Sequence, residues 1–137
     1  MDAERACAVF AGERVARLAT VGGDGVPHLV PVTFAVRGGQ VVMAVDHKPK
    51  TTHNLRRLRN IRENPRVALL ADRYDEDWTR LWWVRADGTA VVYEGGPERD
   101  ASVQVLCEKY AQYRGRTPEG PVIVVEVARW SGWAYTE

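Results

Sequence analysis

The sequence lacks most of the residue patterns that mark metal sites and hydrolytic catalysis. Its two cysteines, Cys7 and Cys107, lie far apart, and its three histidines are not spaced as metal ligands. Ser102 and Ser131 are the only serines, and neither stands in a Gly-x-Ser-x-Gly context. These absences exclude the common zinc motifs and the nucleophile elbow of hydrolases. We therefore expect no metal site, and we expect both cysteines to be small buried hydrophobic residues.

Long hydrophobic runs and a large net charge are also missing. The longest apolar run, Val-Ile-Val-Val at 122–125, is far too short to span a bilayer. The acidic N-terminus has no apolar block followed by a small-residue cleavage site, so we expect a cytoplasmic protein without a membrane partner. The net charge of +1 argues against a protein that coats nucleic acid. Recognition of an anion must therefore be local.

The 137 residues predict one domain, 1–137, with a core of ordinary size. Alternating or continuous apolar segments predict strands at 14–21, 26–36, 41–45, 67–71, 81–85, 89–94 and 122–127. Helical periodicity predicts helices at 3–11, from Thr51 or Thr52 to Asn64, and from 97 to about 114. The Asp-Gly dipeptide at 87–88 predicts a hairpin turn between two of the strands. The mostly antiparallel order, with one crossover helix and one late helix, predicts an α+β fold built on a small closed or split β-barrel. Dimerisation would hide the sheet edges.

The stretch 45–66 is the basic pole of the chain. Its two acids, Asp46 and Glu63, stand against seven cations, which gives a local charge of 7 − 2 = +5. The cations are Lys48, Lys50, Arg56, Arg57, Arg59, Arg62 and Arg66. The junction from Lys48 to Thr52 combines two lysines, a hydroxyl cap and a helix N-terminus, which are the parts of a phosphate site. A solvated helix face rich in arginine is the alternative interpretation.

The strand predicted at 26–36 contains two prolines and a histidine. Pro27 and Pro31 cannot donate to a ladder, so this strand must be bulged or open on one side, either beside a ligand or as a protected edge. His28 shares its inward register with Val30 and Val32, which favours a core or pocket residue. No acid-base constellation can be assembled around it. This lack fits a protein that positions a reactive cofactor, and it fits a binding module equally well.

Three segments together resemble the pyridoxamine 5′-phosphate oxidase-like split β-barrel family. They are Arg14-Val-Ala-Arg-Leu-Ala-Thr-Val, the Gly-x-Pro-His-Leu-Val-Pro-Val strand, and Lys50 followed by Asn64-Pro-Arg-Val-Ala-Leu-Leu. The segment from Tyr74 to Arg85 and the Lys48-Pro-Lys50 entry are similar to the actinobacterial branch of oxidoreductases that depend on the deazaflavin coenzyme F420. The resemblance spans nearly the entire chain. It implies an FMN-binding-protein-like split barrel.

The resemblance also implies a homodimer with two cofactor sites at the interface, each lined by both chains. In this family the cofactor phosphate lies at the strand-to-helix junction, which here is Lys48, Lys50 and Thr51. The residues that would line the ring are His28, Pro31, Val32 and Thr33. Trp78 and Trp82 or Trp83 would wall the pocket from the second chain, unless they are ordinary core residues.

Two departures from the family pattern bear on the cofactor. Flavin-binding members carry an Arg and a Lys in the second strand, whereas residues 26–36 contain neither, which disfavours FMN. The basic helix after Lys50 would suit the anionic γ-glutamyl tail of F420, with Arg56 and Arg57 attracting it. We therefore predict an F420-dependent oxidoreductase that transfers a hydride between the deazaflavin and an electron-poor small molecule. The alternatives are a non-catalytic F420 or FMN carrier and, as a third candidate, a basic-helix binder of nucleic acid.

Overall fold

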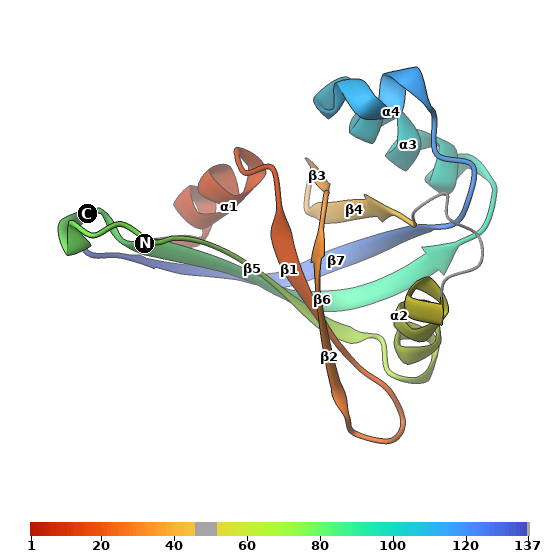
Figure 1. The fold of residues 1–137 in the computed structure, drawn as a ribbon, viewed down its shortest axis with the longest axis horizontal. Helices are drawn as coiled ribbons and strands as arrows, with labels where there is room; N and C mark the ends of the chain where they lie inside the picture. Colours follow the sequence, from red (N-terminus) through yellow and green to blue (C-terminus); the bar gives the residue numbers. More distant parts are fainter. Residues whose placement is uncertain (46–51, 137) are drawn as a thin grey trace.

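The computed structural model describes residues 1–45 and 52–136, with the backbone alone for residues 52–55. The strands are β1 (Ala16–Val21), β2 (Pro27–Val32), β3 (Ala35–Arg37), β4 (Gln40–Ala44), β5 (Arg66–Arg73), β6 (Trp82–Tyr93) and β7 (Val122–Ala134). The helices are α1 (Ala3–Ala11), α2 (Thr52–Glu63), the short 3-10 helix η1 (Trp78–Arg80), α3 (Pro97–Lys109) and α4 (Ala111–Gly115). The strands form one antiparallel sheet in the order β2-β1-β5-β6-β7-β4-β3 (Figure 1). The predicted α+β split-barrel fold is confirmed.

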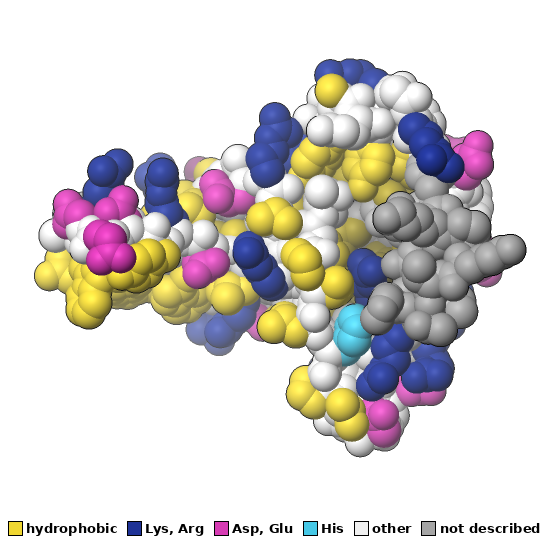
Figure 2. All heavy atoms as spheres, viewed as in Figure 1, with side chains coloured by type: hydrophobic (Ala, Val, Ile, Leu, Met, Phe, Trp, Pro, Cys, Tyr) yellow, Lys and Arg dark blue, Asp and Glu magenta, His cyan; other side chains and the backbone are white. Residues whose placement is uncertain are grey.

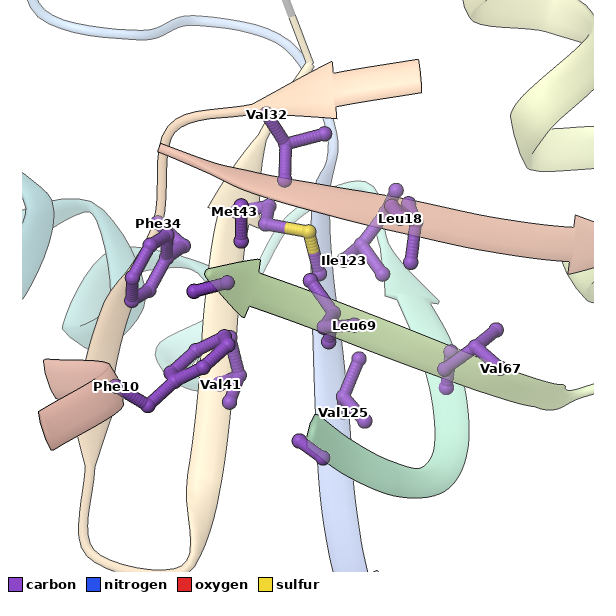
Figure 3. Close-up of a cluster of buried hydrophobic side chains, with 14 of the residues drawn as sticks. Phe10, Leu18, Val32, Phe34, Val41, Met43, Val67, Leu69, Ile123 and Val125 are labelled. Carbon is purple, nitrogen blue, oxygen red and sulfur yellow. The ribbon is translucent and has the colours of Figure 1, made fainter. Parts of the chain in front are cut away.

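The interior of the barrel is filled by side chains from both ends of the chain. Phe10 of α1 packs against Phe34, with 4.5 Å between the ring centroids. Leu18, Leu69 and Ile123 reach the same cluster from three different strands (Figure 3). Because the interior is packed rather than hollow, a cofactor must bind on the outside of the barrel.

The segment predicted as one strand at 26–36 is two strands that lie at opposite edges of the sheet. The break falls at Thr33 and Phe34, between β2 and β3. Phe34 turns fully into the core, and the Tyr110 hydroxyl bonds to its backbone nitrogen and oxygen in place of a neighbouring strand. Among the described strands β2 pairs only with β1, so the open side that Pro27 and Pro31 predict for this strand is confirmed.

The predicted hairpin at Asp87-Gly88 is wrong, because β6 runs straight through it. The pairing of β6 with β7 shifts register at these two residues, which marks a β-bulge. A Cβ at Gly88 would overlap the backbone carbonyl oxygen of Glu126. Glycine at this position therefore allows β6 and β7 to approach each other closely, and it does not mark a reversal of the chain.

The end of β5, the start of β6 and the end of β7 extend beyond the barrel as a twisted arm, and this arm ends at η1 (Figure 1). On the opposite side of the molecule, α3 and α4 replace the single helix predicted from 97 to about 114. Tyr110 separates them, because its backbone adopts φ −118° and ψ 120°, which is extended geometry. This interruption places the Tyr110 side chain over the corner between β2 and β3.

Candidate functional site

Helix α2 is fixed against β1 by a polar contact as well as by its apolar face. Leu58 and Ile61 are buried, as their spacing predicts. The buried Asn60 side chain donates from Nδ2 to Thr20 Oγ1 at 3.1 Å. Gly22 has no Cβ, which leaves room for the Asn60 amide group beside the turn between β1 and β2. The arginine faces of α2 are therefore held in a definite orientation at this turn.

The arginines of α2 reach two neighbouring parts of the sheet, the start of β2 and the end of β6. Arg56 Nη2 is 3.8 Å from Asp24 Oδ2, in the turn that leads into β2, and Arg62 Nη2 is 3.9 Å from Glu94 Oε1. Arg56 and Arg57 are half-buried, whereas Arg59 is exposed. Figure 2 shows dark blue cationic side chains gathered around the position of α2. Long, exposed ion pairs neutralise little charge, so this side of the molecule can attract an anion.

β2 presents different side chains to the barrel and to the outside. His28 is half-buried and faces inward with Val32, which is buried in the core. Leu29 and Pro31 face outward, and Leu29 is 69% exposed. Only the backbone of Val32 can therefore meet a ligand, whereas Pro31 and the exposed Thr33 offer their side chains as well. One edge of β2 pairs with no strand in the described structure, which leaves main-chain donors and acceptors for a ligand or a partner.

Lys48, Lys50 and Thr51, the predicted phosphate ligands, lie outside the described residues. Helix α2 begins at Thr52, directly after this segment, and ends at Glu63 before Pro65. The helix predicted from Thr51 or Thr52 is thus confirmed, whereas the phosphate site at Lys48, Lys50 and Thr51 stays a prediction.

The tryptophans assigned to the pocket wall lie on the arm and not beside β2 of their own chain. Trp78 belongs to η1 and is 62% exposed. Trp82 is half-buried and packs against the main core cluster from the start of β6. Two strands, β1 and β5, separate β6 from β2 in the sheet. A contact of these rings with β2 of a second chain stays a prediction.

A pocket of about 590 Å³ lies at the corner between β2 and β3, where sequence reasoning placed only Thr33. Its other walls include Arg14, Lys109, Tyr110 and Tyr113. The two tyrosines lie in the segment predicted as one helix from 97 to about 114, and nothing local connects Arg14 with that segment, since Lys109 is 95 positions away along the chain. Burial and the nearby Arg14 lower the pKa of Lys109 to about 8. Burial raises the pKa of the Tyr110 hydroxyl.

Two kinds of feature are absent from the part of the chain that the structure describes. Residues 1–45 and 52–136 contain no group of three His, Cys, Asp or Glu side chains that could hold a metal ion. None of the described helices is long and apolar enough to cross a membrane. The geometry therefore offers binding surfaces, at α2 with β2 and at the pocket, without an evident acid-base pair in the described residues.

The chain is similar to proteins of known family and structure. The family model described as pyridoxamine 5′-phosphate oxidase matches residues 3–134. No curated protein matches the chain significantly. A conserved hypothetical protein from Mycobacterium tuberculosis is similar at 25% identity and a TM-score of 0.71, over 98% of this chain and 85% of that one.

Two further solved structures share the fold at lower identity. A FAD-binding protein from Mesorhizobium loti is 21% identical with a TM-score of 0.69, over 96% of this chain and 92% of that one. The heme storage protein HutZ from Vibrio cholerae is 18% identical with a TM-score of 0.71, over 98% of this chain and 94% of that one. The same architecture thus carries different ligands in different proteins.

Proposed function

The chain belongs to the pyridoxamine 5′-phosphate oxidase family, and on that premise we propose that it is an F420-dependent oxidoreductase. It would transfer a hydride between the deazaflavin and an electron-poor small molecule. The observation that carries the proposal is the position of two half-buried arginines, Arg56 and Arg57, on a helix fixed beside the start of β2. β2 is an exposed edge strand without any cation of its own.

The charge around α2 suits a long anionic cofactor better than a single phosphate. Among the described residues Arg56 has one carboxylate partner, Asp24, at 3.8 Å, and none of them forms a hydrogen bond with the buried Nε atom of Arg56. An anionic tail would give this guanidinium a second anionic partner. Lys48, Lys50 and Thr51 would hold the phosphate group at the entry to the helix. The FMN pattern of an Arg and a Lys within the second strand is missing from residues 26–36.

The chain would act by binding and orientation. Reduced F420, when bound, supplies the hydride. The exposed edge of β2 offers main-chain groups from Pro31 to Thr33, and the side chains of these two residues form the outer surface there. Fixed geometry between donor and acceptor can contribute most of the rate in such a transfer. We assign to none of the described residues a role as proton donor or acceptor in this transfer.

A homodimer completes the proposal, with cofactor sites lined by both chains. Leu29 of β2 and Leu70 of β5 are exposed on one face of the sheet, and Trp133 of β7 shares that face at 42% exposure. Figure 2 shows hydrophobic side chains continuing along the lower side of the arm. Arg17 and Arg85, which both pair with Leu70, lie on the same face, and exposed apolar side chains together with arginine are typical of an interface between subunits. In the dimer the arm would carry Trp78 and Trp82 to the partner's β2.

The alternative is a non-catalytic carrier of F420 or FMN. It is favoured by the lack of an acid-base pair in the described residues, and by the storage and FAD-binding roles that two solved relatives bear in their names. A carrier would bind the cofactor without consuming it. Turnover of a panel of enones, quinones and nitro compounds by the loaded protein distinguishes the two functions.

The decisive experiment is a side-by-side fluorescence titration of the protein with F420 and FMN. We expect saturable binding of F420 and much weaker binding of FMN. The Arg56→Gln variant should bind F420 more weakly, whereas Arg129→Gln, on an exposed position of β7, should match the wild type. Saturation by FMN alone would overturn the cofactor assignment, and F420 binding without any turnover would select the carrier.

A further inference from the structure

The pocket at the β2–β3 corner has the form of a small-molecule site. It has a volume of about 590 Å³, within the range of ligand pockets in proteins. Its walls come from four parts of the chain: the segment before β1, the link between β2 and β3, the end of α3 with the residue that follows it, and α4. The residues that line it are Arg14, Thr33, Lys109, Tyr110, Ala111, Gln112 and Tyr113.

Two cations line the pocket, and none of its described lining residues is acidic. Arg14 donates from Nη1 to the carbonyl oxygen of Lys109 at 2.8 Å, which uses one of the five N–H groups of the guanidinium. Lys109 Nζ donates to the carbonyl oxygens of Glu13, at 2.6 Å, and Ala11, at 3.3 Å. Both cations are therefore held in place by neutral main-chain acceptors, and neither forms an ion pair with a carboxylate in the described structure. Such fixed positive charge favours an anionic ligand.

The remaining walls favour a planar ring. The Tyr110 and Tyr113 rings meet edge to face, with 5.6 Å between centroids and 79° between planes. The Arg14 guanidinium lies over the Tyr110 ring at 5.4 Å from its centroid, an arrangement that already pairs a cation with an aromatic face. Thr33 Oγ1 and the Tyr113 hydroxyl are 2.7 Å apart and add two polar atoms at the wall.

We propose that this pocket binds a small aromatic carboxylate, with Arg14 pairing the carboxylate group and the two tyrosines contacting the ring. The site would be new to this chain and separate from the predicted cofactor phosphate site at Lys48, Lys50 and Thr51. Thr33 belongs both to the pocket and to the residues predicted to line the cofactor ring. An aromatic acid bound here would therefore lie next to that ring. Aromatic acids would then be the class of hydride acceptor to which the substrate belongs. This substrate role rests on the proposed function, whereas the binding itself does not.

The test compares 4-nitrobenzoate with its neutral isostere 4-nitrobenzamide by calorimetric titration of cofactor-free protein. The two probes share ring and nitro group, so the difference in affinity reports the carboxylate alone. We expect the acid to bind at least about tenfold more tightly than the amide, since hydrogen bonds to charged groups contribute that much or more. The acid should lose about the same factor in Arg14→Gln. Arg129→Gln, which alters an exposed arginine outside the pocket, should leave the affinity unchanged.

Three outcomes would overturn the proposal: no measurable binding of the acid, equal binding of acid and amide, or full affinity in Arg14→Gln. Should Arg14→Gln fail to fold, Arg14→Lys keeps a cation, and the acid should then retain part of its advantage over the amide; its complete loss would also count against the site. Because F420 is absent from this titration, failure of the cofactor proposal leaves the result intact. Conversely, a protein that binds F420 but binds acid and amide equally would contradict the pocket proposal and leave the cofactor proposal intact.

Discussion

The Tyr110 hydroxyl group is hydrogen-bonded to both backbone polar groups of Phe34. It accepts from the Phe34 nitrogen at 3.1 Å and lies 2.9 Å from the Phe34 carbonyl oxygen, and it is also 2.8 Å from the carbonyl oxygen of Arg14. Phe34 belongs to neither β2 nor β3, yet its ring is fully buried. A single side chain from the end of α3 thus provides what a neighbouring strand provides elsewhere in the sheet.

Tyr110→Phe should lower the free energy of unfolding by about 1–3 kcal/mol, because it leaves buried backbone groups of Phe34 without their partner. Urea unfolding measures this change. Tyr113→Phe is the matched control, since it removes an exposed hydroxyl that contacts Thr33, and its effect should stay within about 0.5 kcal/mol. Equal losses in the two variants would contradict the special role of Tyr110.

Gly88→Ala should destabilise the protein by about 1–3 kcal/mol or more, because the added methyl group meets the backbone carbonyl oxygen of Glu126 and not a flexible side chain. Gly95→Ala is the control, since a Cβ there meets nothing within 4 Å and the backbone needs no positive φ. Thermal unfolding of both variants makes the comparison. A Gly88→Ala variant as stable as wild type would mean that the bulge can shift.

Lys109 should make the stability depend on pH in a defined window. Burial and Arg14 lower its pKa from 10.5 to about 8, so the folded protein releases this proton near pH 8 while the unfolded chain keeps it up to about pH 10.5. In this window the unfolded state binds more protons, and the free energy of unfolding should rise with pH. Above about pH 10 the raised pKa of Tyr110 acts in the opposite direction.

The control for this pH effect is Lys109→Arg, whose guanidinium stays charged throughout. Urea unfolding of both proteins at several pH values from about 7 to about 10 should show a Lys109-dependent rise only in the wild type. Parallel curves for the two proteins would place the Lys109 pKa near its ordinary value.

Lys50→Ala should weaken F420 binding by about 1.5–3 kcal/mol, the contribution of one hydrogen bond to a charged group. Fluorescence titration of the cofactor measures the change, and Arg129→Ala serves as the control for a general loss of positive charge. Unchanged F420 affinity in Lys50→Ala would argue strongly against the predicted phosphate site.

Leu29→Glu should convert the proposed dimer to a monomer, because it replaces the most exposed large apolar residue of that face by a charged one. The molar mass from light scattering gives the answer. Val91→Glu changes a residue that is 48% exposed and pairs with Val124, at the end of β6 opposite to the arm, and it should leave the mass unchanged. A wild-type protein that is monomeric at micromolar concentration would refute the dimer.

Elements that depend on nearby residues could be predicted from the sequence. The bounds of α1 and the end of α2 follow from apolar spacing and from Pro65, and β2 is an edge strand because of its two prolines. The Asp87-Gly88 pair was misinterpreted because its geometry depends on Glu126, which lies on another strand. Likewise, the break at Phe34 depends on Tyr110, a residue 76 positions away.

The candidate site likewise has one part that nearby residues determine and one part that distant residues determine. The basic side of α2 was predictable, since apolar spacing buries Leu58 and Ile61 and turns the arginines outward. The pocket at the β2–β3 corner was not, because Arg14 meets Lys109 only after the whole sheet has closed. Contacts that join such distant residues leave no local pattern in the sequence.

β2 and β3 are the two outermost strands of the sheet, and only Thr33 and Phe34 separate them along the chain. The barrel is therefore closed at this seam by covalent chain and by the Tyr110 hydroxyl, not by a ladder of interstrand bonds. Opening the seam would expose the buried ring of Phe34, which packs against Phe10, while the strand pairs of the described sheet stayed intact. Resistance to opening at this place therefore comes from core packing and not from interstrand hydrogen bonds.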